Sequence, residues 1–200
     1  MADNASTDGT GEIATARGCT VVHVAQRLIA AARNGGARVA KGEILCFVDA
    51  DVRIHAETFN AISTTLDRTD IVAGSTGGRP ERWSAGIALT YAAIVPLCAL
   101  LGVDTGVVFC RRDDFSAVGG YDEGRLIGED VAFLMALRQL GKGRGQRLVR
   151  LTDLKALISM RKYDQHGDWH FLKIIPTAMQ ATIWPSKGGK LADYWYGDHR

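Results

Sequence analysis

Apolar and polar positions along the chain predict strands and helices in turn. Short runs rich in apolar or β-branched residues indicate strands at residues 20–24, 44–48, 71–74, 107–110 and 156–160. Longer segments favour helices at residues 12–16, 30–40, 56–66, 86–102, 129–141 and 169–184. Strands that alternate with helices are typical of a mostly parallel sheet flanked by helices. We therefore predict an α/β fold.

The helix that begins near Glu129 has the clearest pattern. Its apolar residues recur at helical spacing, so one face can pack against a core, and they comprise Val131, Leu134, Leu137 and Leu140. Gly141 and Gly143 mark its end. The last predicted helix, residues 169–184, is rich in aromatic residues, and Pro176 is expected to interrupt it.

Length and composition describe an ordinary globular protein. The 200 residues suit one domain, and neither the 46% apolar nor the 23% charged fraction is unusual. A formal net charge of +2 gives no reason to expect nucleic acid as a partner. The four cysteines include no CxxC pair, and the chain does not open with the pattern of a secretory signal. We therefore expect a cytoplasmic protein.

The segment 83–103 carries no charged residue and is nearly long enough to span a bilayer. Pro96 near its middle, its many small residues and its modest hydrophobicity favour a buried or interfacial helix over a membrane span. We expect a peripheral membrane contact through residues 84–103, which would make the protein membrane-associated.

Two carboxylates stand at the end of the strand at residues 44–48. Asp49 and Asp51 are separated by one residue, so in an extended segment both side chains point the same way. Ligands of α/β sheets gather at the carboxyl ends of strands. A divalent cation that takes one or two carboxylates, with phosphate oxygens and water completing its shell, fits this pair. The alternative is an Asp-rich turn that solvent alone contacts.

A second group of acids lies near residues 119–130. Asp122 and Glu123 follow two glycines, and Glu129 and Asp130 begin the predicted helix. Acids in the first turn of a helix are stabilised by the helix dipole, so Glu129 or Asp130 can be explained without any function. Like charges raise one another's pKa, so the same crowding also suits a general base.

Two basic segments could meet a diphosphate. Arg33 precedes the acidic strand, and Arg111 and Arg112 follow the strand at residues 107–110. Either could equally be a solvated surface charge.

The order and spacing of these segments resemble glycosyltransferase family 2, which has the GT-A nucleotide-sugar fold. The resemblance covers residues 2–141, and its motifs are residues 3–10, 32–35, 40–43, 47–51, 105–106, 111–112, 119–123, 128–130 and 138–141. It implies a single GT-A-like, Rossmann-like domain. Residues 1–75 would form the nucleotide-binding half, and residues 76–200 the acceptor half with a helical tail.

The resemblance also implies roles for individual residues. Asp3 and Asn4 match the pair that contacts the nucleoside base, with Asn4 in place of the commoner aspartate. Arg33 matches an arginine on the nucleotide side. Asp49 and Asp51 match the DxD element, with Asp49 near the ribose and the metal and Asp51 on the metal.

For catalysis, the resemblance implies that Asp130 deprotonates the acceptor hydroxyl, with Glu129 beside it. The reaction would be an inverting, metal-dependent transfer from a nucleoside-diphosphate sugar, with Mg²⁺ or Mn²⁺ as cofactor. The resemblance leaves the acceptor unidentified, and a saccharide or a lipid-linked molecule would both suit such a reaction. His166 is a further candidate ligand of the metal or diphosphate, against the alternative of a surface histidine.

Two departures from the family pattern change the expectation. The Gln-x-x-Arg-Trp element of processive members is absent from its expected place, so transfer of a single sugar is expected. The family begins with an apolar strand and a helix before the Asp-Asn turn, whereas this sequence starts at that turn. We therefore expect an amino-terminally truncated domain, whose central sheet would lack a strand.

Two other functions remain open. Haloacid-dehalogenase-like phosphatases also use Asp-x-Asp after a strand, but the residue two positions further on is usually Thr or Val and in this sequence is Arg53. A truncated, inactive glycosyltransferase-like protein that only binds a partner is the second alternative.

Overall fold

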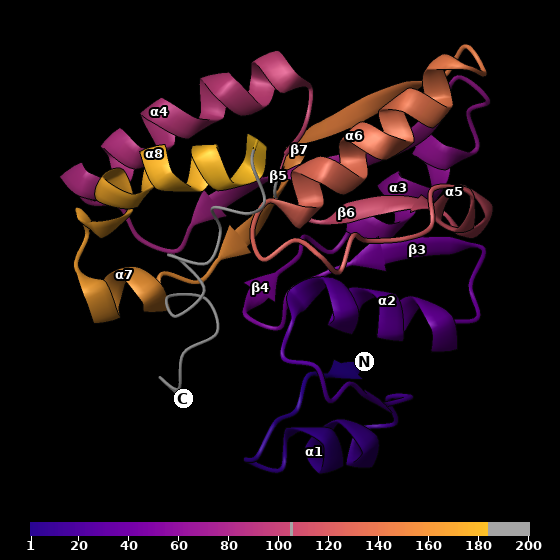
Figure 1. Ribbon diagram of the computed structural model, residues 1–200, viewed down its shortest axis with the longest axis horizontal. Coiled ribbons are helices and arrows are strands. Elements are labelled where there is room, and N and C mark those ends of the chain that lie inside the picture. Colours follow the sequence, from indigo (N-terminus) through magenta and orange to yellow (C-terminus); the bar gives the residue numbers. More distant parts are fainter. Residues whose placement is uncertain (105, 184–200) are drawn as a thin grey trace.

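A computed structural model describes residues 1–104 and 106–183 of the chain (Figure 1). Its main sheet has five strands in the order β3-β6-β5-β7-β4. Their bounds are β3 (Ile44–Phe47), β4 (Val52–Arg53), β5 (Ile71–Pro80), β6 (Val108–Arg111) and β7 (Arg147–Ile158). Helices flank this sheet, so the predicted α/β fold is confirmed.

The sheet is mixed, and the expectation of a mostly parallel sheet needs correction. Only β5 and β7 pair in parallel, whereas β3 with β6, β5 with β6 and β4 with β7 are antiparallel. Alternation of strands and helices in the sequence does not fix strand direction. After α4 (Ala85–Leu101) the chain runs back through the sheet, and β6 enters antiparallel between β3 and β5.

The first part of the chain forms a separate small unit. β1 (Ala2–Asp3) and β2 (Val22–His23) pair in parallel as a two-stranded sheet, with α1 (Thr10–Ala16) between them in sequence. α2 (Ile29–Val39) joins this unit to the main sheet, because its alanines share a core with Leu45 and Phe47 of β3. In Figure 1 this unit lies below β3, which forms one edge of the five-stranded sheet.

Helices cover both faces of the main sheet. α6 (Glu129–Lys142) packs on one face through Phe133, Leu134 and Leu137, beside α2 and α5 (Arg112–Ala117). α3 (Thr58–Leu66) covers the other face through Ile62 and Leu66. α7 (Arg161–His166) and α8 (His170–Ile183) follow β7 and lie against α4 (Figure 1).

The predicted helices are confirmed, whereas several strands were underestimated. β5 continues past residue 74 to Pro80, and β7 begins at Arg147, well before residue 156. The additional residues include glycines, arginines and threonines, so they do not form the apolar run from which these strands were predicted. The short elements β1, β4, α5 and α7 lack enough periodicity to be predicted. α8 continues through Pro176 instead of being interrupted there. Thr105 and Trp184, which fall in predicted segments, lie outside the described residues.

Candidate active site

One buried arginine collects three carboxylates from separate parts of the fold. Arg33 on α2 donates from Nη1 to Glu129 Oε1 (2.9 Å) and Asp130 Oδ1 (2.6 Å), and from Nη2 to Asp49 Oδ1 (3.0 Å). The side chains of Arg33, Glu129 and Asp130 are all less than 20% exposed, whereas that of Asp49 is half exposed. The structure thus brings together four of the residues that the sequence singled out.

The cluster holds more negative than positive charge. Burial raises the pKa of Glu129 and of Asp130, and although Arg33 opposes this shift, both pKa values stay above the ordinary carboxylate range. Burial disfavours the charge on Arg33 too, but Asp130, Asp49 and Glu129 together raise its pKa above the usual value. The site therefore contains a permanent cation and two carboxylates with elevated proton affinity.

Tyr121 completes the cluster and was missed in the sequence. Its hydroxyl donates to Asp130 Oδ1 (3.1 Å), its ring stacks on Phe133 (4.2 Å between centroids), and Arg33 lies 5.2 Å from the ring centre. Burial raises the pKa of Tyr121 well above its normal value. The Gly119-Gly120-Tyr121 sequence was a usable signal, because a buried tyrosine after flexible glycines needs a hydrogen-bond partner.

Two glycines position these residues. Gly120 has φ +76°, and a Cβ there would lie 2.7 Å from Asn34 Oδ1, so only glycine lets this loop approach α2. Asn34 then binds the loop through both the backbone N–H and the carbonyl of Tyr121. Gly128 caps α6 with φ +72°, which turns Glu129 and Asp130 toward Arg33 at the positive end of the helix dipole.

Asp51 lies beside cations of α7 and not beside Arg33. Arg161 Nη2 is 3.8 Å from Asp51 Oδ2, and both side chains are exposed. Lys162 is half-buried, and burial lowers its pKa to about 8 even though Asp51 and Asp49 oppose the shift. The first turn of α7 therefore brings two basic residues, Arg161 and Lys162, close to the Asp49–Asp51 segment. Nothing in the sequence around residues 161–162 predicted that they would lie there.

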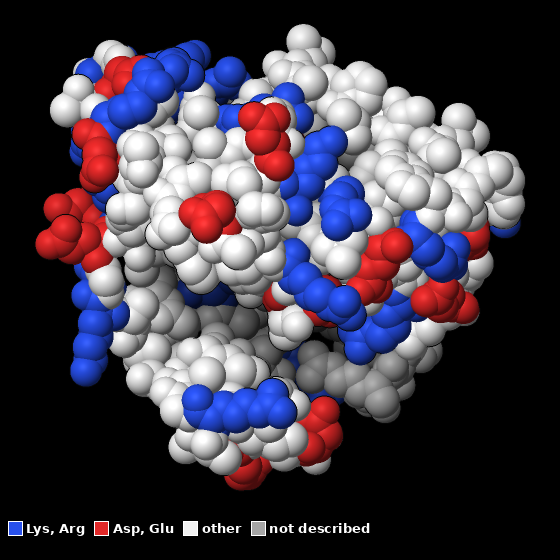
Figure 2. Space-filling view, turned by 180° about the vertical axis from the view of Figure 1, so that it is seen from behind, with Lys and Arg blue, Asp and Glu red and all other residues white. Residues whose placement is uncertain are grey.

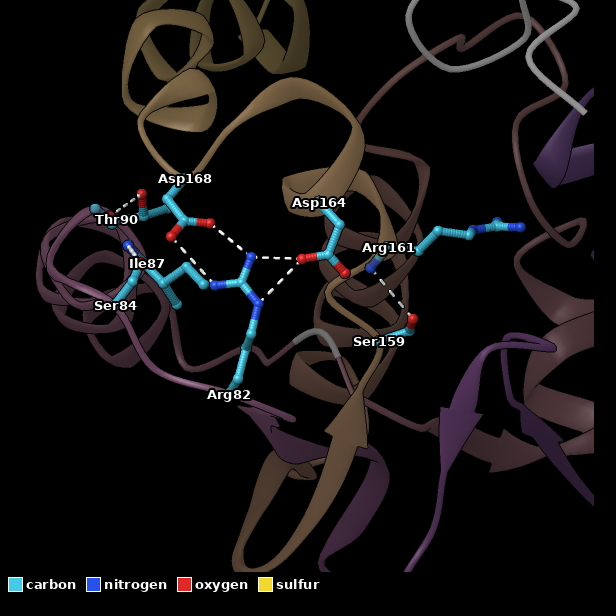
Figure 3. Close-up of polar contacts among 9 residues, drawn as sticks. Arg82, Ser84, Ile87, Thr90, Ser159, Arg161, Asp164 and Asp168 are labelled. Carbon is cyan, nitrogen blue, oxygen red and sulfur yellow. Dashed lines mark hydrogen bonds and ion pairs between the residues drawn. The ribbon is translucent and has the colours of Figure 1, made fainter.

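Arg82 holds α7 and α8 in place (Figure 3). Its guanidinium donates to Asp164 Oδ1 on α7 (3.0 Å from Nε) and to Asp168 Oδ1 between α7 and α8 (2.7 Å from Nη2). Hydrogen bonds from Arg82 lower the pKa of Asp168. Gly86 allows the same close approach, since a Cβ there would lie 2.5 Å from the Asp168 carbonyl oxygen.

We expect Arg82→Ala to loosen α7 without unfolding the protein. Because Arg82 is partly exposed, its ion pairs contribute little to global stability, yet they join α7 to the segment that leads into α4 (Figure 3). Amide hydrogen exchange should quicken in residues 161–168. Arg68→Ala, which breaks a similar exposed pair with Asp70, is the matched control and should leave α7 unchanged. Equal exchange of α7 in Arg82→Ala and wild type would contradict this assignment.

Asp3 and Asn4 lie in the β1–β2 unit. Asp3 is buried, accepts from Ser6 N (3.1 Å) and pairs with His23 Nδ1 (2.9 Å), and the Ser6 and His23 contacts hold its pKa below the usual range. Asn4 donates to the Gln26 carbonyl (2.6 Å). Within the described part of the chain, no hydrogen bond or ion pair joins either residue to the Arg33 cluster.

Two other candidates have structural explanations. Arg111 donates to backbone carbonyls of Ile71 and Arg68, and Arg112 to those of Ala40 and Gly42. Both arginines therefore hold neighbouring backbone segments together, which gives them a structural role. That this pair meets a diphosphate stays a prediction.

His166 is exposed and stacks on His170, with 4.9 Å between ring centroids. This placement fits the surface histidine that the sequence left as an alternative.

The acids fit a metal only if the ligand supplies most of the coordination. Among the described residues, no three His, Cys, Asp or Glu side chains gather closely enough to hold an ion on their own. Asp49 and Asp51 are each about half exposed and one residue apart, with cations facing them. That set suits Mg²⁺ or Mn²⁺ bound through one or two carboxylates and diphosphate oxygens.

Several solved structures share this fold. The mannosyltransferase PcManGT from Pyrobaculum calidifontis, solved with GDP-Man and Mn²⁺, aligns with 98% of this chain and 61% of its own, at 20% identity and a TM-score of 0.61. S. aureus TarS aligns with 96% of this chain and 36% of its own, at 17% identity and a TM-score of 0.61. The fold is thus that of the GT-A glycosyltransferases.

A third similar structure is glucosyl-3-phosphoglycerate synthase from Mycobacterium tuberculosis, solved with Mn²⁺, UDP-glucose and phosphoglyceric acid. It aligns with 94% of this chain and 67% of its own, at 16% identity and a TM-score of 0.59. The chain therefore spans between about one third and two thirds of these three proteins.

A family model also matches part of the sequence. Residues 1–86 match the model of Glycosyl transferase family 2, which confirms the resemblance to that family over this part of the chain. No curated protein sequence matches the chain.

Proposed function

We propose that this site transfers one sugar, with inversion, from a nucleoside-diphosphate sugar to an acceptor hydroxyl. The observation that carries the proposal is the convergence of Asp49, Glu129 and Asp130, from two separate segments of the chain, on one buried arginine. One carboxylate is enough to pair with an arginine in a purely structural role. Three carboxylates around one arginine instead favour a site that binds a charged ligand and transfers protons. The shared fold of glycosyltransferases supports the same assignment.

Asp130 is the proposed general base. Arg33 and Tyr121 both donate to its Oδ1, which leaves Oδ2 as the oxygen that would face the acceptor. Its raised pKa improves it as a base at neutral pH. In the proposed step Oδ2 takes the hydroxyl proton, the acceptor oxygen bonds to the anomeric carbon, and the bond from that carbon to the diphosphate breaks. Glu129, bound to the same guanidinium, helps to orient Arg33.

The diphosphate would lie between Asp49–Asp51 and α7. Asp49 and Asp51 would hold Mg²⁺ or Mn²⁺, which supplies positive charge for the departing diphosphate. Arg161 and Lys162 face the same segment and would add two further cations. Asp3 and Asn4 would contact the nucleoside. Residues 1–75 would thus bind the nucleotide, and residues 76–200 the acceptor.

Substitution of Asp51 tests the proposal. Mixtures of UDP-, GDP- and dTDP-sugars with Mn²⁺ should yield free nucleoside diphosphate, through transfer or slow hydrolysis. Asp51→Asn keeps the shape but removes the charge, so the rate should fall at least about tenfold, mainly by weaker donor binding. Asp67→Asn, an exposed acid at the end of α3, is the control and should retain the rate. Release of inorganic phosphate from a generic phosphomonoester, abolished in Asp49→Asn, would instead favour a phosphatase.

A lipid surface is the proposed partner of α4. In the described part of the chain every helix falls short of what a membrane crossing needs. However, α4 exposes apolar residues, among them Leu89 (53%), Val95 (46%) and Leu100 (82%), and Trp83 and Trp169 are exposed nearby. Figure 2 shows an uncharged region at its upper right, where α4 and α8 lie. Exposed tryptophans beside an apolar helix are typical of membrane interfaces.

Vesicle flotation tests this contact. The wild-type chain should float with phosphatidylcholine–phosphatidylglycerol vesicles, and a variant with Leu89, Val95 and Leu100 changed to Ser should not. A second variant with Ser in place of Ile13 and Phe59, which are similarly exposed on α1 and α3, is the control and should float. Wild-type protein that stays with the unbound fraction would contradict the contact.

A further inference from the structure

A groove with basic side chains in its walls is lined by the residues that follow Asp51 in the sequence, from Arg53 to Ala56, and by β5 and β7. It has a volume of about 500 Å³ and lies along β4, β5 and β7. Its walls combine the apolar side chains of Ile54, Ala56 and Leu157 with polar and charged ones, namely Arg53, His55, Arg79, Thr152, Asp153 and Lys155.

Strand register explains why the basic residues meet. Arg53 of β4 lies opposite Leu157 of β7, and on the other side of β7 the same Leu157 lies opposite Arg79 of β5. Residues opposite one another in a sheet point to the same face, and so does Lys155, two positions before Leu157. Three cations from three neighbouring strands therefore share one face around a single apolar residue.

The acids near the groove do not balance these cations. Glu81 lies 3.3 Å from Arg53, and Asp153 lines the wall. The Arg53 side chain is 77% exposed, so its pair with Glu81 is weak and can open. Arg79 and Lys155 are also exposed. Cations in a concavity concentrate anions there.

We propose that this groove binds the phosphate or carboxylate group of a small molecule, and that this molecule is the sugar acceptor. Guanidinium groups match both anions through paired hydrogen bonds. Arg53 follows Asp51 by two residues, in β4 directly after the turn that carries Asp51. A hydroxyl-bearing molecule anchored here by its anionic end therefore reaches toward the diphosphate site. The acceptor role rests on the proposed function, whereas anion binding does not.

Inorganic phosphate is the probe, titrated into the whole chain and followed by amide NMR shifts. We expect saturable binding with a Kd in the millimolar range, with shifts in β4, β5 and β7. The double variant Arg79→Glu, Lys155→Glu should bind phosphate at least about tenfold more weakly. The control double variant Arg17→Glu, Lys41→Glu changes two exposed cations elsewhere, has the same net charge and should bind phosphate as the wild type does.

The titration is repeated with UDP and Mn²⁺ at saturation. Unchanged phosphate affinity supports a groove separate from the diphosphate site. Three outcomes would overturn the proposal: no saturation in the wild type, equal weakening in both double variants, or displacement of phosphate by UDP. Asp51→Asn separates this proposal from the proposed function, because it should lose UDP binding and keep phosphate binding.

Discussion

Asp130→Asn is expected to abolish sugar transfer while donor binding persists. The amide keeps the oxygen that accepts from Arg33 and Tyr121, so the geometry around residue 130 should survive. An amide cannot take a proton from the acceptor, and loss of a general base lowers rates by about 10²–10⁴. We expect kcat to fall about 10³-fold and the Kd of the nucleoside diphosphate to change less than about threefold.

Asp122→Asn is the matched control for this substitution. Asp122 lies eight residues earlier, is exposed, and pairs with Arg125 outside the Arg33 cluster. It should leave both kcat and donor binding unchanged. Full turnover by Asp130→Asn would remove Asp130 from the role of base and point to Glu129 or to Asp49.

Arg33→Met is expected to destabilise the protein strongly and also to inactivate it. Methionine approximates the aliphatic length of arginine but leaves Glu129 and Asp130 buried without their counter-charge. Removal of one partner from a buried ion pair typically lowers the free energy of unfolding by about 3–5 kcal/mol. We expect a loss of about 3 kcal/mol at neutral pH, measured by urea denaturation without metal or nucleotide.

The loss should depend on pH in a defined direction. In the folded wild type the pKa values of Glu129 and Asp130 are already raised, so the folded state binds protons that the unfolded state releases. Stability therefore falls as pH rises from the unfolded pKa of about 4 through the raised values. Arg33 lowers those values, and without it they rise further. The difference between variant and wild type should be larger at about pH 7.5 than at about pH 5.

Arg38→Met controls for the change of residue type, because Arg38 lies on the same helix without a carboxylate partner among the described residues. It should change stability by less than about 0.5 kcal/mol. An Arg33→Met effect that is small, or that is equal at both pH values, would mean that the carboxylates are not held in their charged state by Arg33.

The sequence predicted the acids of this site better than their partners. Asp49, Glu129 and Asp130 were found because they stand at the end of a strand and the start of a helix, where side chains of α/β folds meet ligands. Arg33 was assigned to the nucleotide side through the family resemblance alone, and nothing in the sequence indicated that its guanidinium binds Glu129 and Asp49. Arg33 and Glu129 are 96 residues apart in the sequence, so a local sequence pattern cannot predict that their side chains form a hydrogen bond.

The other residues of the site could not be predicted, because only tertiary contacts bring them there. Arg161 and Lys162 come near Asp51 only because β7 ends opposite β4 and because Arg82 fixes α7. Tyr121 is buried against Phe133, and its hydroxyl finds Asp130 through a loop whose shape depends on Gly120. Sheet direction was mispredicted for a similar reason: the periodicity of a strand is the same whichever way it runs.

The central claim is that Asp49 and Asp51 form a metal-dependent nucleoside-diphosphate site. Titration calorimetry of the folded chain with UDP and GDP, each with Mn²⁺ and with EDTA, tests it most directly. We predict saturable binding of at least one nucleotide in the presence of Mn²⁺. Its affinity should fall at least about tenfold when EDTA replaces Mn²⁺, and by a similar factor in the Asp51→Asn variant. No binding of either nucleotide in Mn²⁺, or equal binding in EDTA, would contradict it.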